Sequence, residues 1–160
     1  MDRLWSPWRY AYVSDASLSS GCIFCDHASS GEDRKHYILH RGRKNYALLN
    51  LYPYTTGHLM IAPYEHVASL GETSEGTLEE MILLARRSEE ALRAVYHPSG
   101  LNLGMNIGEC AGAGVAGHIH LHVVPRWPAD SNFMTTVGET RVLPEDLETT
   151  YRKLLAAYSR

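Results

Sequence analysis

The segment from 117 to 127 places the strongest limit on the fold, because it alternates histidine with branched apolar residues. The alternating run reads His118, Ile119, His120, Leu121, His122 and Val123. Successive side chains of a β-strand point to opposite faces of its sheet. A strand in this segment therefore places three imidazoles in a row on one face and three apolar side chains in the core. We expect a sheet with one apolar face and one face that carries the histidines.

The remaining periodicity predicts an α+β fold around this strand. Further strands are expected at 46–51, 58–62 and 101–107, which are bounded by turn residues. Helices are expected over 77–96 and 144–158, the second with Pro144 in its first turn. The predicted fold is a mostly antiparallel sheet with a long central helix and a C-terminal helix.

The apolar stripes of the two helices identify the sides that should face the sheet. In the long helix the stripe consists of Leu78, Met81, Ile82, Ala85, Ser88, Leu92 and Val95. In the C-terminal helix it consists of Leu147, Tyr151, Leu154, Leu155 and Tyr158.

Length and composition favour one compact domain over residues 1–160. The chain is 44% apolar and 21% charged, a composition unlike that of disordered proteins. Residues 1–20 are predicted to form an irregular arm, anchored by its aromatic side chains. The net charge of −3 gives no long-range attraction for nucleic acid. Apolar runs are too short to span a membrane, and the first ten residues lack the apolar centre of a signal peptide.

The three cysteines indicate a reducing compartment, which makes the cytoplasm the expected location. An odd number of cysteines in a chain of this size is not typical of a disulfide framework. Cys22 and Cys25 form a CxxC pair, whereas Cys110 lies far from them in the sequence. The pair by itself is compatible with a zinc site, a redox site or two buried thiols. Redox activity is the least favoured of the three, since no strand and helix are predicted around the pair.

The histidine row permits two kinds of chemistry. Histidines two residues apart on a strand are able to ligate one zinc ion that keeps an open position for water. Alternatively, one neutral imidazole is a nucleophile, and its neighbours hold it in the correct tautomer.

The loop before the histidines favours a phosphate ligand. Between 108 and 117 it contains four glycines, and its residues from 111 onward are small. A backbone of this kind approaches a ligand closely and is able to direct successive N–H groups at phosphate oxygens. Gly112, Ala113 and Gly114 are the loop residues expected to line the substrate site.

Several motifs in order resemble the histidine triad superfamily of nucleotidyl transferases and hydrolases. The motifs are Cys22-Ile23-Phe24-Cys25, Leu49-Asn50, Gly57-His58-Leu59, Ala62-Pro63-Tyr64-Glu65-His66 and His118-Ile119-His120-Leu121-His122-Val123-Val124. Three further segments look like the bacterial diadenosine tetraphosphate phosphorylases: residues 102–108, Pro125-Arg126-Trp127 and Asn132-Phe133-Met134. The resemblance covers most of the chain.

The resemblance implies a catalytic group formed by His118, His120 and His122. In this family the middle histidine attacks the α-phosphorus, so His120 would carry a covalent nucleotidyl intermediate and His122 would line the phosphate site. The phosphorylase branch releases the nucleotide with inorganic phosphate as co-substrate. The implied reaction is phosphorolysis of diadenosine tetraphosphate to ATP and ADP.

The resemblance also assigns substrate and metal ligands. Asn106 and Gly114 would lie at the phosphate site, and Asn50 would hold ribose. In relatives that carry the cysteine pair, the remaining zinc ligands correspond to His66 and His118. The family pairs its protomers by joining sheets, which implies a homodimer or a larger assembly. Trp127 follows the triad and is expected to line the mouth of the site.

Two alternative functions remain open at the level of sequence. The first is a dinucleoside polyphosphate hydrolase or an adenosine phosphoramidase. These branches carry a glutamine or serine shortly before the triad, where this chain has Gly114 and Val115. The second is a zinc-stabilised nucleotide-binding module without turnover. A row of three aligned imidazoles favours an enzyme over such a module. His36 and His40 lie in a charged stretch that is interpreted as a solvated face.

Overall fold

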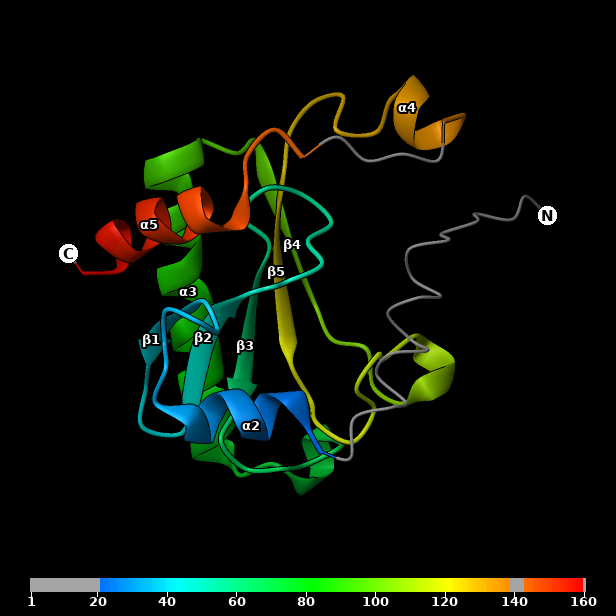
Figure 1. Cartoon of the computed structure of the whole chain (residues 1–160). Coiled ribbons are helices and arrows are strands. Elements are labelled where there is room, and N and C mark those ends of the chain that lie inside the picture. The colour runs from blue at the N-terminus through cyan, green and yellow to red at the C-terminus, as the bar shows by residue number, and fades with distance from the viewer. Residues whose placement is uncertain (1–20, 139–142, 160) are drawn as a thin grey trace.

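The computed structural model describes residues 21–138 and 143–159, so the arm predicted at 1–20 lies outside the described residues. Within these ranges five strands form one antiparallel sheet in the order β1-β2-β3-β5-β4 (Figure 1). They are β1 (Ile38–Arg41), β2 (Asn45–Leu49), β3 (Leu59–Pro63), β4 (Gly100–Gly104) and β5 (Leu121–Arg126). The predicted α+β class with an antiparallel sheet is confirmed.

Both predicted helices are present among the described residues, and two shorter α-helices accompany them. The four are α2 (Ile23–Ser30), α3 (Glu75–Tyr96), α4 (Phe133–Thr136) and α5 (Leu147–Tyr158). Two short 3₁₀ helices, η1 (Leu70–Glu72) and η2 (Glu109–Ala111), lie in loops. In the described ranges, no helix is both long enough and apolar enough to cross a membrane.

Side-chain caps determine where the two long helices begin. The hydroxyl of Ser74 accepts a hydrogen bond from the backbone N–H of Thr77 at the start of α3. The carboxylate of Asp146 accepts one from the N–H of Thr149 at 2.8 Å. The C-terminal helix therefore starts after Asp146, and the expectation that Pro144 lies in its first turn is wrong, because the capping carboxylate is the stronger start signal.

Helices α3 and α5 pack on one face of the sheet and form the main core. The sheet contributes Ala47, Leu49, Leu59, Ile61, Leu121 and Val123. Ile82 was expected in the buried stripe of α3, and this expectation is wrong, since the residue is 61% exposed. Met81, the residue before it, is buried. Because each residue turns a helix by about 100°, Ile82 points away from the side that Met81 faces. The buried stripe passes instead through Leu84 and Ala91. Leu155 of α5 is likewise exposed at its surface.

Helix α2 covers part of the opposite face (Figure 1). Phe24 of α2 packs in a second cluster with Tyr46, Leu48, Met60 and Ala62. The phenol of Tyr46 donates to the carbonyl of Phe24 at 2.7 Å, which fixes the helix on the sheet. The face therefore has a covered end over β2 and β3, whereas β5 and β4 continue beyond α2.

Two elements were not expected from the sequence. Helix α2 begins directly after Cys22, which contradicts the expectation that no helix accompanies the cysteine pair. Strand β1 includes His40, which was interpreted as part of a solvated face. The His40 ring is instead half-buried, because the guanidinium of Arg87 approaches it within 3.4 Å and the ring of Tyr158 stacks on it.

Candidate active site

The histidine segment alternates as predicted, but its strand begins three residues later than expected. Strand β5 starts at Leu121, and residues 118–120 run before it without ladder pairing. The register places residue 119 beside Pro63, which has no N–H to donate. The N–H of Ile119 donates instead to the carbonyl of Val67 at 2.8 Å. Ile119, Leu121 and Val123 are all buried in the main core, so the three histidines share the other side.

His120 has the protonation pattern that a nucleophile needs. Its Nδ1 lies 2.9 Å from the carbonyl oxygen of His118. A carbonyl only accepts, so Nδ1 carries the proton and the lone pair is on Nε2. The ring is 6% exposed and lies 4.6 Å from the ring of Phe24, measured between centroids. This burial lowers the pKa of His120, which keeps the imidazole neutral near pH 7.

His122 is held in the opposite tautomer by His58. The backbone N–H of Tyr54 donates to Nδ1 of His58 at 3.1 Å, so the proton of neutral His58 is on Nε2. That N–H points at Nδ1 of His122 across 2.9 Å. Neutral His122 therefore carries its proton on Nε2 and acts as a donor. Burial, together with the neighbouring His120, lowers the pKa of His122 to about 4.

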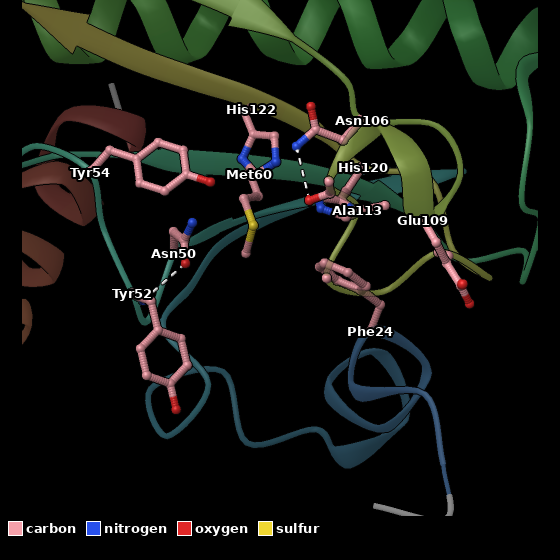
Figure 2. A pocket seen from close by; sticks show the side chains of 13 residues that line it. Phe24, Asn50, Tyr52, Tyr54, Met60, Asn106, Glu109, Ala113, His120 and His122 are labelled. Carbon is pink, nitrogen blue, oxygen red and sulfur yellow. Dashed lines mark hydrogen bonds between the residues drawn. The ribbon is translucent and has the colours of Figure 1, made fainter. Parts of the chain in front are cut away.

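His120 and His122 border a cavity of about 370 Å³ on the face that α2 leaves open (Figure 2). Five residues that the sequence assigned to the substrate lie on its wall: Asn50, Asn106, Gly112, Ala113 and Gly114. In Figure 2 the side chains of His120, His122 and Asn106 gather at one end, whereas Asn50 and Tyr52 lie at the other.

The small-residue loop forms one wall of the cavity in a tight conformation. Gly108 and Gly112 have φ values of 84° and 86°, which favour glycine. The amide of Asn106 donates to the carbonyl of Gly112 and ties the loop to the end of β4. Further along, the backbone N–H groups of residues 114–117 donate to no acceptor within the described part of the chain. Consecutive N–H groups without protein acceptors, beside a cavity, are suited to bind an anion.

His118 faces away from the cavity and toward the cysteine pair. The ligand atoms of Cys22, Cys25, His66 and His118 all lie within 4.8 Å of one another. Nδ1 of His118 is 3.4 Å from Cys22 Sγ and 3.6 Å from Cys25 Sγ, and Nδ1 of His66 is 3.4 Å from Cys25 Sγ. A tetrahedral zinc with ordinary bond lengths holds sulfur and nitrogen ligands about 3.6 Å apart. The four groups therefore fit such an ion.

Comparison with known proteins identifies the family. The family model described as the HIT domain matches residues 31–129. The chain is a member of the HIT domain family. It is 36% identical to a Mycobacterium tuberculosis protein named AP-4-A phosphorylase, over the whole of this chain and 86% of that protein. The resemblance seen in the sequence is thereby confirmed.

Solved structures of other HIT proteins share the fold. A zinc-bound histidine triad family protein from Mycobacterium smegmatis superposes with a TM-score of 0.71 at 29% identity. The match covers 87% of this chain and 94% of that one. A hypothetical histidine triad nucleotide-binding protein from Sulfolobus tokodaii gives a TM-score of 0.68 at 25% identity, over 86% and 92% of the two chains.

Trp127 lines a different cavity from the one that His120 and His122 border. Its indole N–H donates to the carbonyl of Tyr96 at 3.3 Å, and its ring lines a neighbouring cavity of about 540 Å³. Tyr54 borders both cavities, whereas Trp127 does not line the histidine cavity of this HIT domain.

Several residues of the HIT domain's cavity were not predicted from the sequence. These are Phe24, Tyr52, Tyr54, Met60, Glu109 and Ala116. Met60 had no local signal, because its position opposite His122 depends on the pairing of β3 with β5. Phe24 had none, since its helix was not expected. His58 was noted as part of a motif, but its contact with His122 depends on the register of two strands.

The cysteine cluster connects three segments of the HIT domain beside the end of the cavity that His120 borders. Cys22 and Cys25 lie at the start of α2, and His66 lies in the connection after β3. Nε2 of His118 donates to the carbonyl of Pro63 at 2.9 Å, which leaves its Nδ1 lone pair for a metal. Both ring nitrogens of His118 are thus engaged outside the cavity. The contact of His118 with His120 is made by its backbone carbonyl, which accepts from Nδ1 of His120.

Proposed function

We propose that this protein cleaves dinucleoside polyphosphates by nucleotidyl transfer to His120 and releases the nucleotide with inorganic phosphate. One observation carries the proposal. Neutral His120, whose proton is fixed on Nδ1, borders the same cavity as Gly114 and Ala116, whose backbone N–H groups donate to no acceptor within the described ranges. The mycobacterial relative named AP-4-A phosphorylase supports diadenosine tetraphosphate as the substrate and ATP and ADP as the products.

In the first step, Nε2 of His120 attacks the α-phosphorus of the bound nucleotide. A P–N bond forms, and the bond from that phosphorus to its bridging oxygen breaks, so ATP departs with the electron pair. Charge that develops on the non-bridging oxygens faces the loop N–H groups and the Nε2–H of His122. The carbonyl of His118 stabilises the cationic ring that results, because Nδ1 keeps its proton.

In the second step, an anionic oxygen of inorganic phosphate attacks the same phosphorus. The P–N bond breaks, the electron pair returns to Nε2, and ADP leaves. Asn106 and the loop residues Gly112, Ala113 and Gly114 are proposed to hold the incoming phosphate, and Asn50 to hold the ribose. No side chain at Gly114 or Val115 offers a hydrogen bond to a water molecule, which favours phosphate as the acceptor.

Cys22, Cys25, His66 and His118 are proposed to hold a structural zinc ion. Four protein ligands close the coordination sphere, so the ion supplies structural support and no open catalytic position. The zinc-bound mycobacterial structure supports this proposal, and so does the spacing of the four donor atoms. Thiolates bind zinc only when they are not oxidised, which supports the cytoplasm as the location.

Self-association through the edge of the sheet is also proposed. Strand β4 is an edge strand whose sequence, GLNLG, contains no charge or proline to prevent pairing with another strand. Leu103 on this strand presents exposed apolar surface. A homodimer or larger assembly would cover it. Sedimentation equilibrium measures the mass directly, and a monomer at micromolar concentration would contradict this proposal.

Product analysis tests the reaction. Diadenosine tetraphosphate is incubated with the protein, with and without inorganic phosphate, and nucleotides are separated by anion-exchange chromatography. ADP and ATP that appear only with phosphate support phosphorolysis. AMP and ATP without phosphate would show that water is the acceptor and that the chain is a hydrolase. The variant His120→Asn serves as the control for contaminating activity, and no products from the wild-type protein would contradict both assignments.

A further inference from the structure

The two cysteines of the CxxC pair lie on the same side of the first turn of α2. Cys22 is the N-cap residue, and Cys25 is the third residue of the helix. Residues three positions apart are neighbours on a helix surface. Both thiols are partly exposed. Redox activity was disfavoured because no helix was expected beside the pair, and the structure removes that reason.

The two sulfur atoms are close enough to form a disulfide after a small movement. Sγ of Cys22 and Sγ of Cys25 lie within 4.8 Å of each other, and a disulfide joins two sulfur atoms at about 2.05 Å. Cys22 has an extended backbone conformation outside the helix, and its side chain does not cap α2. Cys22 is therefore able to move toward Cys25 without breaking a hydrogen bond of the helix.

A disulfide and a zinc ion at this place exclude each other. Thiolates bind zinc at about 2.3 Å, which holds two sulfur ligands of a tetrahedral site about 3.8 Å apart. The sulfur atoms of a disulfide are much closer together and carry no negative charge, so they no longer serve as metal ligands. His66 and His118 would then be the remaining members of the cluster. Two ligands of four do not retain the ion.

Small molecules in solution reach the pair from the side of His66. The His66 side chain is exposed, and its contact with Sγ of Cys25 lies at the surface. On the other side of the cluster, His118 is fully buried. Oxidation of a cysteine by a hydroperoxide follows thiolate character and exposure. Cys25 is therefore the expected point of attack, with Cys22 as the neighbouring thiol.

We infer that Cys22 and Cys25 form a redox-sensitive pair, which a hydroperoxide oxidises to a disulfide with release of the zinc ion. The inference rests on the proposed zinc site, because the release of the ion is one of its two consequences. It gives the cysteine pair a second, reversible state in addition to its structural role.

The oxidation consumes one hydroperoxide in two steps. The thiolate of Cys25 attacks a peroxide oxygen, so an S–O bond forms, the O–O bond breaks, and the departing hydroxide takes up a proton to become water. The thiolate of Cys22 then attacks the sulfur of this sulfenic acid. The S–S bond forms, the S–O bond breaks, and a second hydroxide leaves and is protonated. The two sulfur atoms together lose two electrons, which the peroxide oxygens gain.

Phe24 links the state of the pair to the cavity. It lies between the two cysteines in the sequence and lines the cavity. Its ring centroid is 4.6 Å from that of His120 and 5.2 Å from that of His118. The backbone carbonyl of His118 also accepts the hydrogen bond that fixes His120. Oxidation of the pair should therefore lower kcat by about tenfold or more, as the loss of groups that support a site does.

The test follows both consequences of oxidation in the zinc-loaded, full-length protein. Hydrogen peroxide is added, the remaining thiols are alkylated, and mass spectrometry identifies the state of the peptide that contains both cysteines. A chromogenic chelator measures the released zinc. We expect a peptide that lacks two hydrogens and takes up no alkylating reagent, and about one zinc ion released per disulfide. Dithiothreitol and added zinc should restore the thiols, the bound ion and kcat.

Cys110 is the internal reference for the peroxide, because it is exposed and lies outside the cluster. Oxidised Cys110 beside intact Cys22 and Cys25 thiols and retained zinc would overturn the inference. Sulfinic acid on either cysteine without a disulfide would overturn it as well. Methionine sulfoxide on Met60 of the cavity wall requires a reductase for its reversal. A loss of kcat that dithiothreitol does not reverse would therefore contradict the link between the pair and the reaction.

The variant His66→Ala separates this inference from the zinc assignment. It removes one proposed ligand at an exposed position and keeps both thiols, so the disulfide should form several-fold faster than in the zinc-loaded wild-type protein. A wild-type protein that binds no zinc but forms the disulfide would reject the metal site and the release of the ion. Full zinc content with no disulfide in either protein would reject the redox pair alone.

Discussion

His58 donates a hydrogen bond from Nε2 to Nδ1 of His122 across 2.9 Å. His58 is itself fixed by the backbone N–H of Tyr54. The pair therefore sets the tautomer of His122 from outside the histidine triad, and in the proposed reaction the remaining N–H of His122 would face the charge that develops on the phosphate.

Replacing His58 should impair the reaction through His122. In His58→Ala the proton of His122 is no longer directed to Nε2, and we expect kcat to fall by about 10- to 100-fold. KM should change much less, because His58 does not line the cavity. His58 is buried, so thermal unfolding of the variant must be measured as well. A stable variant with the wild-type kcat would show that the tautomer of His122 does not matter.

The stability of the protein should fall as the solution is acidified below pH 6.5. Burial and His120 lower the pKa of His122 to about 4 in the folded state, against an ordinary value of about 6.5. Between these values the unfolded chain binds the proton and the folded chain does not. The stabilisation is complete above the unfolded pKa and is lost toward the folded one. It amounts to on the order of 1–3 kcal/mol for this partly exposed ring.

Urea unfolding at pH 7 and pH 5 checks the contribution of His122. The loss of unfolding free energy between these two values should be smaller in His122→Asn than in the wild-type protein. Equal losses in the two proteins would contradict the assigned pKa shift.

Loss of one cysteine ligand should release zinc and loosen the catalytic end of the cavity. Cys25→Ser is expected to lower the zinc content from about one ion per chain, the stoichiometry of a closed four-ligand site. Its melting temperature should fall by several degrees, because α2 carries Phe24 against His120. Cys110→Ser is the control, since Cys110 is exposed and outside the cluster. Elemental analysis and calorimetry measure both effects. Full zinc content in Cys25→Ser would refute the ligand assignment.

Glu80 should matter for stability and not for the reaction. Its carboxylate accepts the backbone N–H groups of Arg43, Lys44 and Asn45 at 2.6–2.9 Å, and only 15% of its side chain is exposed. Glu80→Gln removes the charge that these donors share and should cost about 1–3 kcal/mol. Glu79→Gln, on the exposed side of the same helix, should cost almost nothing. Denaturant unfolding distinguishes the two, and similar small losses would contradict the role given to Glu80.

The general fold could be predicted because its signals are local. Alternation at 118–123 and the helical period of α3 follow from the sequence alone, and both are present. The exposure of Ile82 was missed because neighbouring apolar residues define a stripe only to within one position. Strand β1 and helix α2 were missed since their short segments depend on contacts with distant residues, as in the packing of Tyr158 on His40.

The candidate site could be predicted in part. The alternation placed the three histidines on one side, but it could not show that His118 turns to the cysteines while His120 and His122 face the cavity. That division follows from Pro63, whose carbonyl accepts from His118 and whose missing N–H ends the strand ladder. Pairing between distant strands, which brings Met60 and His58 to His122, was likewise not readable from local patterns.

The central claim is that His120 carries the transferred nucleotide. The most direct measurement mixes the protein with diadenosine tetraphosphate in phosphate-free buffer, quenches within seconds, and locates the adduct by mass spectrometry of the proteolysed chain. The account predicts an adenylyl group on the peptide that contains His120, acid-labile as a phosphoramidate. That group should disappear with formation of ADP when phosphate is added before the quench. ATP release without any adduct, or an adduct on another residue that phosphate discharges to ADP, would contradict the account.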